Sequence, residues 1–257
     1  MNTPIRWHKV FGVAALLFGV SLAQAQHSGD VWVGRSSAGQ LKISSQGYVP
    51  EENYHTLYPV SGLLNGWTDD SPGFDHISTD DPPADLYRLQ SGAQIWLEVV
   101  ALDPAFRLID SVFQILDAPG EQTYLGDHTL HVHNTWHINS DDPAYDPDQC
   151  VWHAAFILRD TGSTQYVPSE PFTFSFTNVP VRPSGTPADG DFDADQDVDT
   201  DDYRALAACL GGPDLIPDPD DPEVTTCEVE CLNAFDFDDD RDVDLRDFAG
   251  FQLVFGP

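Results

Sequence analysis

The chain has few positively charged side chains for its length. Its 257 residues include 11 Lys and Arg against 43 Asp and Glu, which gives a formal net charge of −32 at neutral pH. Nucleic acids and anionic membrane surfaces repel a protein with such an excess of negative charge. The composition therefore argues against nucleic acid and anionic membranes as partners.

Long apolar runs are equally scarce, and the one that is present lies near the start. An apolar stretch over residues 10–22 follows two basic residues and ends at the A-x-A sequence of 23–25, which is the pattern of a secretory signal peptide. The stretch is too short and has the wrong flanks for a stable membrane span. We therefore expect residues 1–25 to be removed and the mature chain, starting at Gln26, to be secreted, periplasmic or located at the cell surface.

Cysteine is limited to four positions, 150, 209, 227 and 231. Export from the cytoplasm permits disulfides. The sequence predicts one bridge from Cys209 to either Cys227 or Cys231, and the spacing does not choose between them. The Cys227-x-x-x-Cys231 spacing also suits a pair of zinc ligands, although no second cysteine pair accompanies it.

Signatures of the common hydrolases are absent from the sequence. It contains no G-x-S-x-G, no H-E-x-x-H and no phosphate-binding loop. A glycosidase needs two carboxylates that flank the scissile bond, and Glu98 is the one acidic residue with an evident strand setting and no evident partner. The sequence therefore favours a protein without catalytic activity.

Residues 26–179 show short alternating patterns typical of β-strands, separated by turn-forming Asp, Pro, Gly and Ser. The expected strands cover 31–33, 40–44, 94–102, 106–116, 129–138, 151–158 and 172–176. This pattern predicts a mostly β fold, with a β-sandwich or jelly-roll domain over 26–179. A proline-rich linker over 180–188 then leads to a small helical module over 189–257.

Two aspartate-rich stretches of this module, 191–202 and 236–247, are the most informative part of the chain. Each has carboxylates at positions 1, 3, 5, 9 and 12 and a Val at position 8. In an EF-hand-type loop these positions supply hard oxygen ligands to Ca²⁺, and position 7 supplies its backbone carbonyl. Two stretches in the same register, each followed by an apolar helical pattern, predict two calcium sites.

The segments 191–211 and 236–256 resemble the duplicated loop-helix segments of a type I dockerin, a module that binds calcium and docks onto a cohesin domain. The resemblance implies no entering helix before either loop. It implies the following ligands, with Asp197 and Asp242 acting through their backbone carbonyls: Asp191, Asp193, Asp195, Asp197, Asp199 and Asp202, then Asp236, Asp238, Asp240, Asp242, Asp244 and Asp247.

Two features depart from the dockerin pattern. Position 6 is usually Gly because the loop turns there through positive φ, yet this chain has Gln196 and Arg241, so we expect about 1 kcal/mol of strain per site. Positions 10 and 11, which contact cohesin in the family, differ between the two repeats. The resemblance thus implies a cohesin-like partner or cell-surface component, but not a symmetric binding surface.

The β domain is rich in histidine. His131, His133 and His137 fall on one face of an expected strand, because side chains alternate along a strand. His131 and His133 can offer two imidazoles to one metal ion, and we expect a third ligand, with His153 from another strand first and His137 second. Imidazole nitrogens suit zinc or copper. The alternative is a solvated strand face that holds no metal.

This region also resembles, over a short length, secreted bacterial proteins whose expression is tied to zinc supply. The resemblance lies in Gly-Asp-x-x-Val-Gly over 29–34 and H-x-H-x-x-W-H over 131–137. It implies no particular activity.

Taken together, the sequence predicts a secreted, non-catalytic, calcium-binding protein with a dockerin-like module and a histidine-rich β domain. The alternative is a carbohydrate-binding or polysaccharide-degrading component attached through a dockerin–cohesin contact. Its support is a set of tryptophans that would stack on sugars, although strand tryptophans more often belong to a core. These residues are Trp32, Trp67, Trp96, Trp136 and Trp152.

Overall fold

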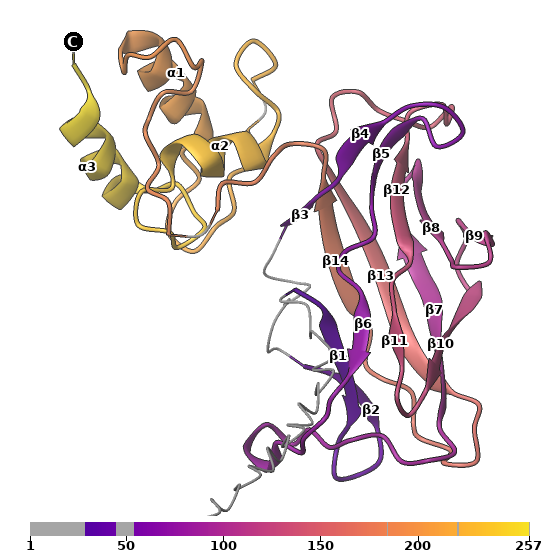
Figure 1. Ribbon diagram of the computed structural model, residues 1–257. Helices are drawn as coiled ribbons and strands as arrows, with labels where there is room; N and C mark the ends of the chain where they lie inside the picture. The colour runs from indigo at the N-terminus through magenta and orange to yellow at the C-terminus, as the bar shows by residue number, and fades with distance from the viewer. Residues whose placement is uncertain (1–28, 45–53, 184, 220, 257) are drawn as a thin grey trace, which may run out of the picture.

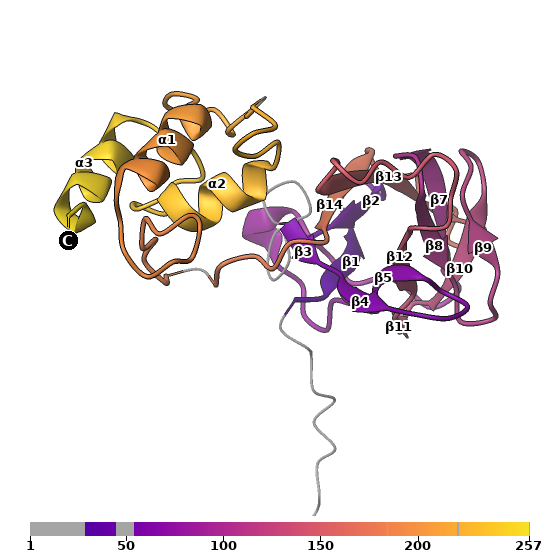
Figure 2. The ribbon, with the colours of Figure 1, turned by 90° about the horizontal axis from the view of Figure 1, so that it is seen from above.

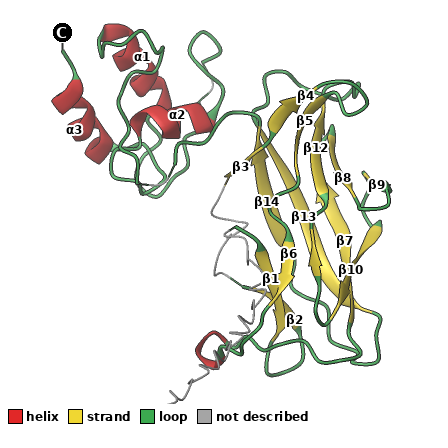
Figure 3. Ribbon diagram, viewed as in Figure 1, coloured by secondary structure: helices red, strands yellow, loops and turns green. Residues whose placement is uncertain are grey.

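The computed structural model describes residues 29–44, 54–183, 185–219 and 221–256. Among these residues, strands dominate the part before residue 180, and three α-helices lie in the part after it (Figures 1 and 3). The expected fold class, a mostly β sandwich-like domain followed by a small helical part, is confirmed. The expected signal peptide lies outside the described residues.

The β domain is built from three sheets. Their strand orders are β11-β6-β1-β2, β10-β7-β13-β14-β3 and β4-β5-β12-β8-β9. Figure 2 shows the second and third sheets as two facing layers. In chain order the strands are β1 (Val31–Arg35), β2 (Leu41–Ile43), β3 (Tyr54–Thr56), β4 (Tyr58–Val60), β5 (Gly66–Asp69), β6 (Phe74–His76), β7 (Gln94–Leu102), β8 (Phe106–Ile109), β9 (Ile115–Leu116), β10 (Gln122–Asp127), β11 (His131–Val132), β12 (Thr135–Asn139), β13 (Val151–Asp160) and β14 (Phe172–Thr177).

Aromatic side chains fill the space between the two facing sheets. The buried ring of Trp136 on β12 lies 5.1 Å from the ring of Phe174 on β14, measured between centroids. Phe106 on β8 stacks on Phe176 on β14 at 4.7 Å. Burial of each such side chain contributes roughly 1.5–3 kcal/mol. The alternation of Phe and small polar residues along β14 is therefore what holds the layers together.

Most of the expected strands are present, but two of them are interrupted. The stretch 106–116 forms β8 and β9, joined by a turn in which Phe113 has a φ of 66°. The stretch 129–138 divides into β11 and β12, which belong to different sheets. The remaining strands, β3 to β6 and β10, are too short or too polar to be expected from the sequence.

The helical module consists of α1 (Thr200–Cys209), α2 (Glu228–Phe235) and α3 (Leu245–Val254). α1 and α3 follow the two aspartate loops, as expected. α2 differs from what the dockerin resemblance implies, because it enters the second loop. It buries Val229, Cys231 and Phe235, and the Phe235 ring meets that of Phe251 on α3 at 6.0 Å. This shared core explains why so short a helix forms.

Both disulfides involve the helical module. Cys209–Cys231 joins α1 to α2 and so decides between the two partners that the sequence left open. Cys150–Cys227 joins the β domain to the residue that precedes α2. Because Cys227 and Cys231 belong to different bridges, they do not form a zinc-binding pair.

The β domain and the module also make noncovalent contacts. The hydroxyl of Tyr54 on β3 donates a hydrogen bond of 2.6 Å to Oε1 of Glu228 on α2. Burial raises the pKa of this hydroxyl, so it remains a donor. The guanidinium of Arg241, in the second aspartate loop, lies 5.9 Å from the centre of the Tyr54 ring. In the expected linker, Arg182 donates to the backbone carbonyl of Asp236 at 2.7 Å.

Candidate metal centres

The two aspartate loops end in the same way. Asp199 caps α1 and Asp244 caps α3, and each cap is a capping box. In a capping box the cap residue and the third helical residue accept hydrogen bonds from each other's backbone N–H groups. These third residues are the position-12 aspartates, Asp202 and Asp247, whose exposed fractions are 1% and 0%. The start of each helix therefore fixes the carboxylate that is expected to close its site.

The position-12 carboxylates also reach across their loops. Asp202 accepts hydrogen bonds from the backbone N–H groups of Phe192 and Asp199 at 2.6 and 2.8 Å. Asp247 accepts the equivalent pair in the second loop, both at 2.8 Å. Each loop is thus closed around one buried carboxylate by the same two bonds.

The backbone turns sharply in the middle of each loop. At position 6, Gln196 has a φ of 78° and Arg241 a φ of 71°, as the loop pattern predicts. Position 4 is left-handed as well, with φ of 60° at Ala194 and 62° at Asp239, which the sequence did not indicate. The turn aims backbone N–H groups of positions 5 and 6 at the position-1 carboxylate in both loops, at 3.0 to 3.2 Å.

The remaining carboxylates converge within each loop. In four groups of three aspartates, one oxygen from each lies within 4.8 Å of the others: Asp191, Asp193 and Asp202; Asp197, Asp199 and Asp202; Asp236, Asp238 and Asp247; Asp240, Asp242 and Asp247. Asp195 and Asp244 are outside these groups. Asp195 accepts a hydrogen bond from the backbone of Asp197, and Asp244 caps α3. Asp242 has a second role, because its Oδ2 accepts a hydrogen bond of 2.5 Å from the backbone of Asp214.

The electrostatics of the loops reflect this crowding. Loss of hydration, with repulsion from Asp195, raises the pKa of Asp193. Repulsion from Asp195 is the main cause of the raised pKa of Asp197. In the second loop, burial raises the pKa of both Asp236 and Asp247. Carboxylates that resist ionisation in such surroundings gain the most from a nearby cation.

The two loops are also joined to each other. Gly256, which follows α3, donates its backbone N–H to the carbonyl of Val198 in the first loop at 3.0 Å. Gly211, which follows α1, donates to the carbonyl of Val243 in the second loop at 3.1 Å. Each position-8 valine therefore accepts a hydrogen bond from the second residue after the helix of the other loop, so the two loops form one unit.

A second cluster lies on the first sheet of the β domain, where β6 pairs with β1 on one side and with β11 on the other. The register places Asp30 and His133 on either side of Gly73, at one level of the sheet. His131 lies opposite Asp75, two residues further along β6. Since neighbouring residues point to opposite faces, these side chains share the face that is turned away from the core.

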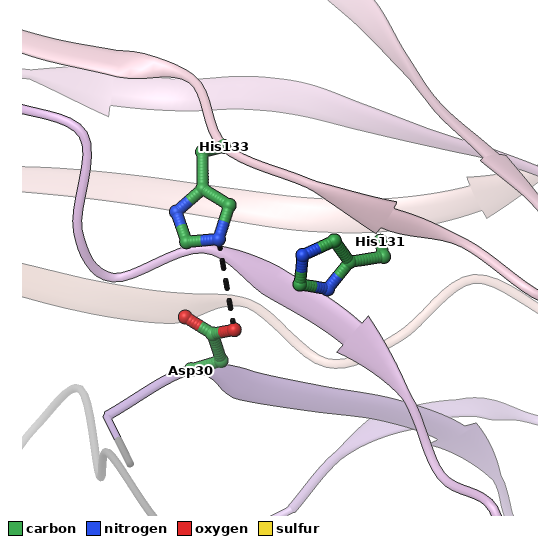
Figure 4. A group of neighbouring side chains, drawn as sticks. All are labelled: Asp30, His131 and His133. Carbon is green, nitrogen blue, oxygen red and sulfur yellow. Dashed lines mark ion pairs between the residues drawn. The ribbon is translucent and has the colours of Figure 1, made fainter. Parts of the chain in front are cut away.

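Gly73 allows the His133 ring to lie across the central strand. A Cβ at Gly73 would come within 2.6 to 2.8 Å of atoms of that ring. The ring therefore reaches Asp30, with His133 Nε2 3.7 Å from Asp30 Oδ2 (Figure 4). One ligand atom each from Asp30, His131 and His133 lies within 4.8 Å of the others.

The other two candidate histidines lie elsewhere. His137 on β12 is 2% exposed, its Nε2 lies 3.3 Å from the Asn65 carbonyl oxygen, and burial lowers its pKa. His153 on β13 is exposed and its Nδ1 lies 3.1 Å from Ser175 Oγ. Neither belongs to a potential metal-binding group within the described residues. The structure instead brings Asp30 to His131 and His133.

Two further expectations change. Glu98 is not without a partner, because Arg159 donates to both of its carboxylate oxygens and Gln122 donates to one. These bonds lower the pKa of Glu98 and make it part of a salt bridge rather than a candidate catalytic acid. Trp136 and Trp152 are fully buried, so they do not form a sugar-stacking platform with the other tryptophans.

No family model, curated protein or solved structure matches the chain. Among the described residues, no helix combines the length and the apolar character needed to cross a membrane. Several acidic and histidine groups have the spacing to hold a metal ion. The donor atoms and the geometry of each group determine which ion it prefers.

Proposed function

We propose that the chain is a secreted calcium-binding protein whose helical module binds two Ca²⁺ ions, one in each aspartate loop. The observation that carries this proposal is the convergence of aspartates on a buried position-12 carboxylate, repeated in both loops. The same capping boxes and the same left-handed turns support it in each copy.

The donor atoms favour calcium over other common metal ions. Every proposed ligand is a hard oxygen, and Ca²⁺ takes six to eight of them at about 2.3–2.6 Å in flexible geometry. Mg²⁺ demands a stricter octahedron, and Zn²⁺ prefers nitrogen and sulfur. Calcium would offset the repulsion between these carboxylates, and binding to the folded module alone would stabilise it.

Calorimetry on the mature chain, residues 26–257, tests the proposal. We expect two Ca²⁺ per chain, a higher melting temperature with Ca²⁺, and the loss of one site each in Asp202→Ala and Asp247→Ala. Asp201→Ala is the matched control, because Asp201 is exposed and outside the converging groups. A stoichiometry of zero, or melting that EDTA leaves unchanged, would contradict the proposal.

A second function, docking onto a cohesin-like protein, has one observation in its favour. α3 presents apolar side chains to solvent, with Leu245 76% and Leu253 87% exposed. Exposed apolar residues that gather on one element are typical of an interaction surface. We expect the calcium-loaded chain to bind a cohesin domain, and Leu245→Ala with Leu253→Ala to weaken that binding. If no tested cohesin binds the parent chain or the double variant, the docking function is refuted. The calcium proposal is unaffected by that result.

A further inference from the structure

We propose that Asp30, His131 and His133 bind one divalent ion of the zinc type and leave one coordination position open to solvent. The centre belongs to the β domain and does not depend on the calcium module. It uses a carboxylate from the residue before β1, one imidazole from β11 and one from the residue after β11.

The distances fit a mononuclear centre. A zinc ion about 2.0–2.1 Å from each nitrogen lies about 3.2 Å from each ring centre, so two imidazoles at a tetrahedral angle have centres about 5.2 Å apart. The rings of His131 and His133 are 5.3 Å apart. The tetrahedral separation between a ligand nitrogen and a ligand oxygen is about 3.4 Å. His133 Nε2 and Asp30 Oδ2 are 3.7 Å apart, so a small closure would place both on one ion.

Asp30 gives independent support for a ligand at this position. The residue is 2% exposed, and its Oδ1 accepts a hydrogen bond of 3.0 Å from the backbone N–H of Gly73. Its Oδ2 is buried and makes no hydrogen bond within the described residues. A buried carboxylate oxygen in that state is unfavourable unless another group compensates for the lost hydration. The oxygen points toward His133, where a metal ion would supply that compensation (Figure 4).

The surroundings of the histidines resemble those of metal ligands. His133 Nδ1 lies 2.9 Å from the backbone carbonyl oxygen of Asp70. Since a carbonyl oxygen only accepts, Nδ1 carries the hydrogen, and Nε2 has the lone pair in the neutral ring. His131 Nδ1 lies 3.7 Å from Oδ2 of Asp75, a buried carboxylate that His76 holds through its backbone N–H at 2.8 Å. Carbonyl and carboxylate partners of this kind orient metal-bound imidazoles.

The donor set also indicates the type of ion and its reactivity. Two nitrogens and one oxygen suit Zn²⁺ and exclude a calcium-like site, which requires oxygen ligands alone. Three protein ligands leave the fourth position of a zinc ion to water or to an added anion. The Asp30 side chain is 3% exposed, whereas the His131 side chain is 39% exposed. The open position therefore faces solvent on the histidine side.

The test uses the mature chain, stripped of metal with EDTA and then saturated with Ca²⁺ so that the aspartate loops do not take up zinc. We expect one Zn²⁺ per chain with a dissociation constant below about 1 µM. Asp30→Asn keeps an acceptor for the Gly73 N–H but removes the charged ligand, and His131→Ala removes an exposed one. Each should weaken binding by about 100-fold or more, beyond the roughly 10–100-fold typical of an outer-shell change.

Gly73→Ala is the most specific variant, because it alters no ligand. The new Cβ would displace the His133 ring, so zinc affinity should fall by about 10-fold or more. His153→Ala is the control, since His153 is exposed on another sheet and should leave zinc affinity unchanged. Thermal melting in EDTA verifies that each variant is folded.

Substitution with Co²⁺ tests the open position. An added anion such as azide should change the visible absorption of the bound Co²⁺, and an unchanged spectrum would overturn the claim of an open position. A zinc dissociation constant above about 10 µM would overturn the site itself. So would zinc binding by the His131→Ala, His133→Ala double variant that is as tight as in the parent chain.

Discussion

Position 6 of the aspartate loops provides the sharpest quantitative test of their geometry. Gln196 has a φ of 78°, a conformation that costs a non-glycine residue about 1–2 kcal/mol. Glycine removes that cost. However, the greater conformational freedom of glycine in the unfolded chain lowers the stability of the folded state by about 0.5–1 kcal/mol. Gln196→Gly should therefore increase the free energy of unfolding of the module by about 0.5–1 kcal/mol.

Arg241→Gly should gain less at the equivalent position. Its φ of 71° gives the same relief of strain. However, the Arg241 guanidinium lies 5.9 Å from the centre of the Tyr54 ring on the β domain. A cation–π contact of this kind is worth about 0.5–1 kcal/mol at a partly exposed site. Its loss offsets the relief, so the expected net change is close to zero.

Chemical denaturation of the calcium-loaded mature chain, followed by far-ultraviolet circular dichroism, measures both changes. The helical signal reports the module, because all α-helices of the described residues lie there. Ala207→Gly, on the exposed side of α1, is the control and should cost about 1 kcal/mol. Destabilisation by Gln196→Gly as large as that by Ala207→Gly would refute the strain at position 6. A gain in stability by Arg241→Gly as large as that by Gln196→Gly would refute the contribution of the Tyr54 contact.

Two further predictions concern the β domain and its attachment. The pKa of Glu98 is lowered by Arg159, so this salt bridge stabilises the fold above the unfolded-state pKa of about 4.3 and is lost as the pH falls through the lower folded-state value. Glu98→Gln should cost about 1 kcal/mol at pH 7. Urea titrations should show the difference from the parent shrink as the pH falls below the unfolded-state value and disappear below the lowered folded-state pKa; a constant difference would contradict this. Replacing both Cys150 and Cys227 by Ser removes a disulfide between residues 77 apart in sequence. The chain-entropy model gives such a disulfide a stabilising contribution of about 4.5 kcal/mol at most. We expect calorimetric melting of the double variant to separate into two transitions, and a single unshifted transition would refute a stabilising role of the bridge.

The convergence within the two aspartate loops could largely be predicted because the aspartates of each loop lie within twelve consecutive residues. Spacing predicted most of the converging carboxylates and the turn at position 6, but not that Asp195 and Asp244 lie outside the converging groups. The left-handed position 4 was missed because Ala194 carries no sign of it, unlike a glycine. The short helix α2 was missed because its stability comes from a disulfide and from Phe235 packing against distant residues rather than from its own pattern.

The cluster of Asp30, His131 and His133 could be predicted from the sequence only in part. Alternation correctly grouped His131 with His133, because that inference needs only one strand. Asp30 lies about a hundred residues away, and only the pairing of three strands around Gly73 brings it to the histidines. His137 was grouped by the same alternation, but the chain changes sheets between β11 and β12. A long-range register of this kind is set by the packing of the whole domain.

The hydrogen bonds from Gly211 to Val243 and from Gly256 to Val198 join the two repeats, so neither repeat can be transferred to another protein alone. The last residue of each repeat donates a backbone hydrogen bond to the position-8 valine of the other repeat. A single repeat fused to another protein would lack that partner and would also lose the Cys209–Cys231 bridge. A transferable module therefore consists of both repeats together with the segment between them. That segment contains Cys227, so the recipient protein must supply a cysteine in place of Cys150.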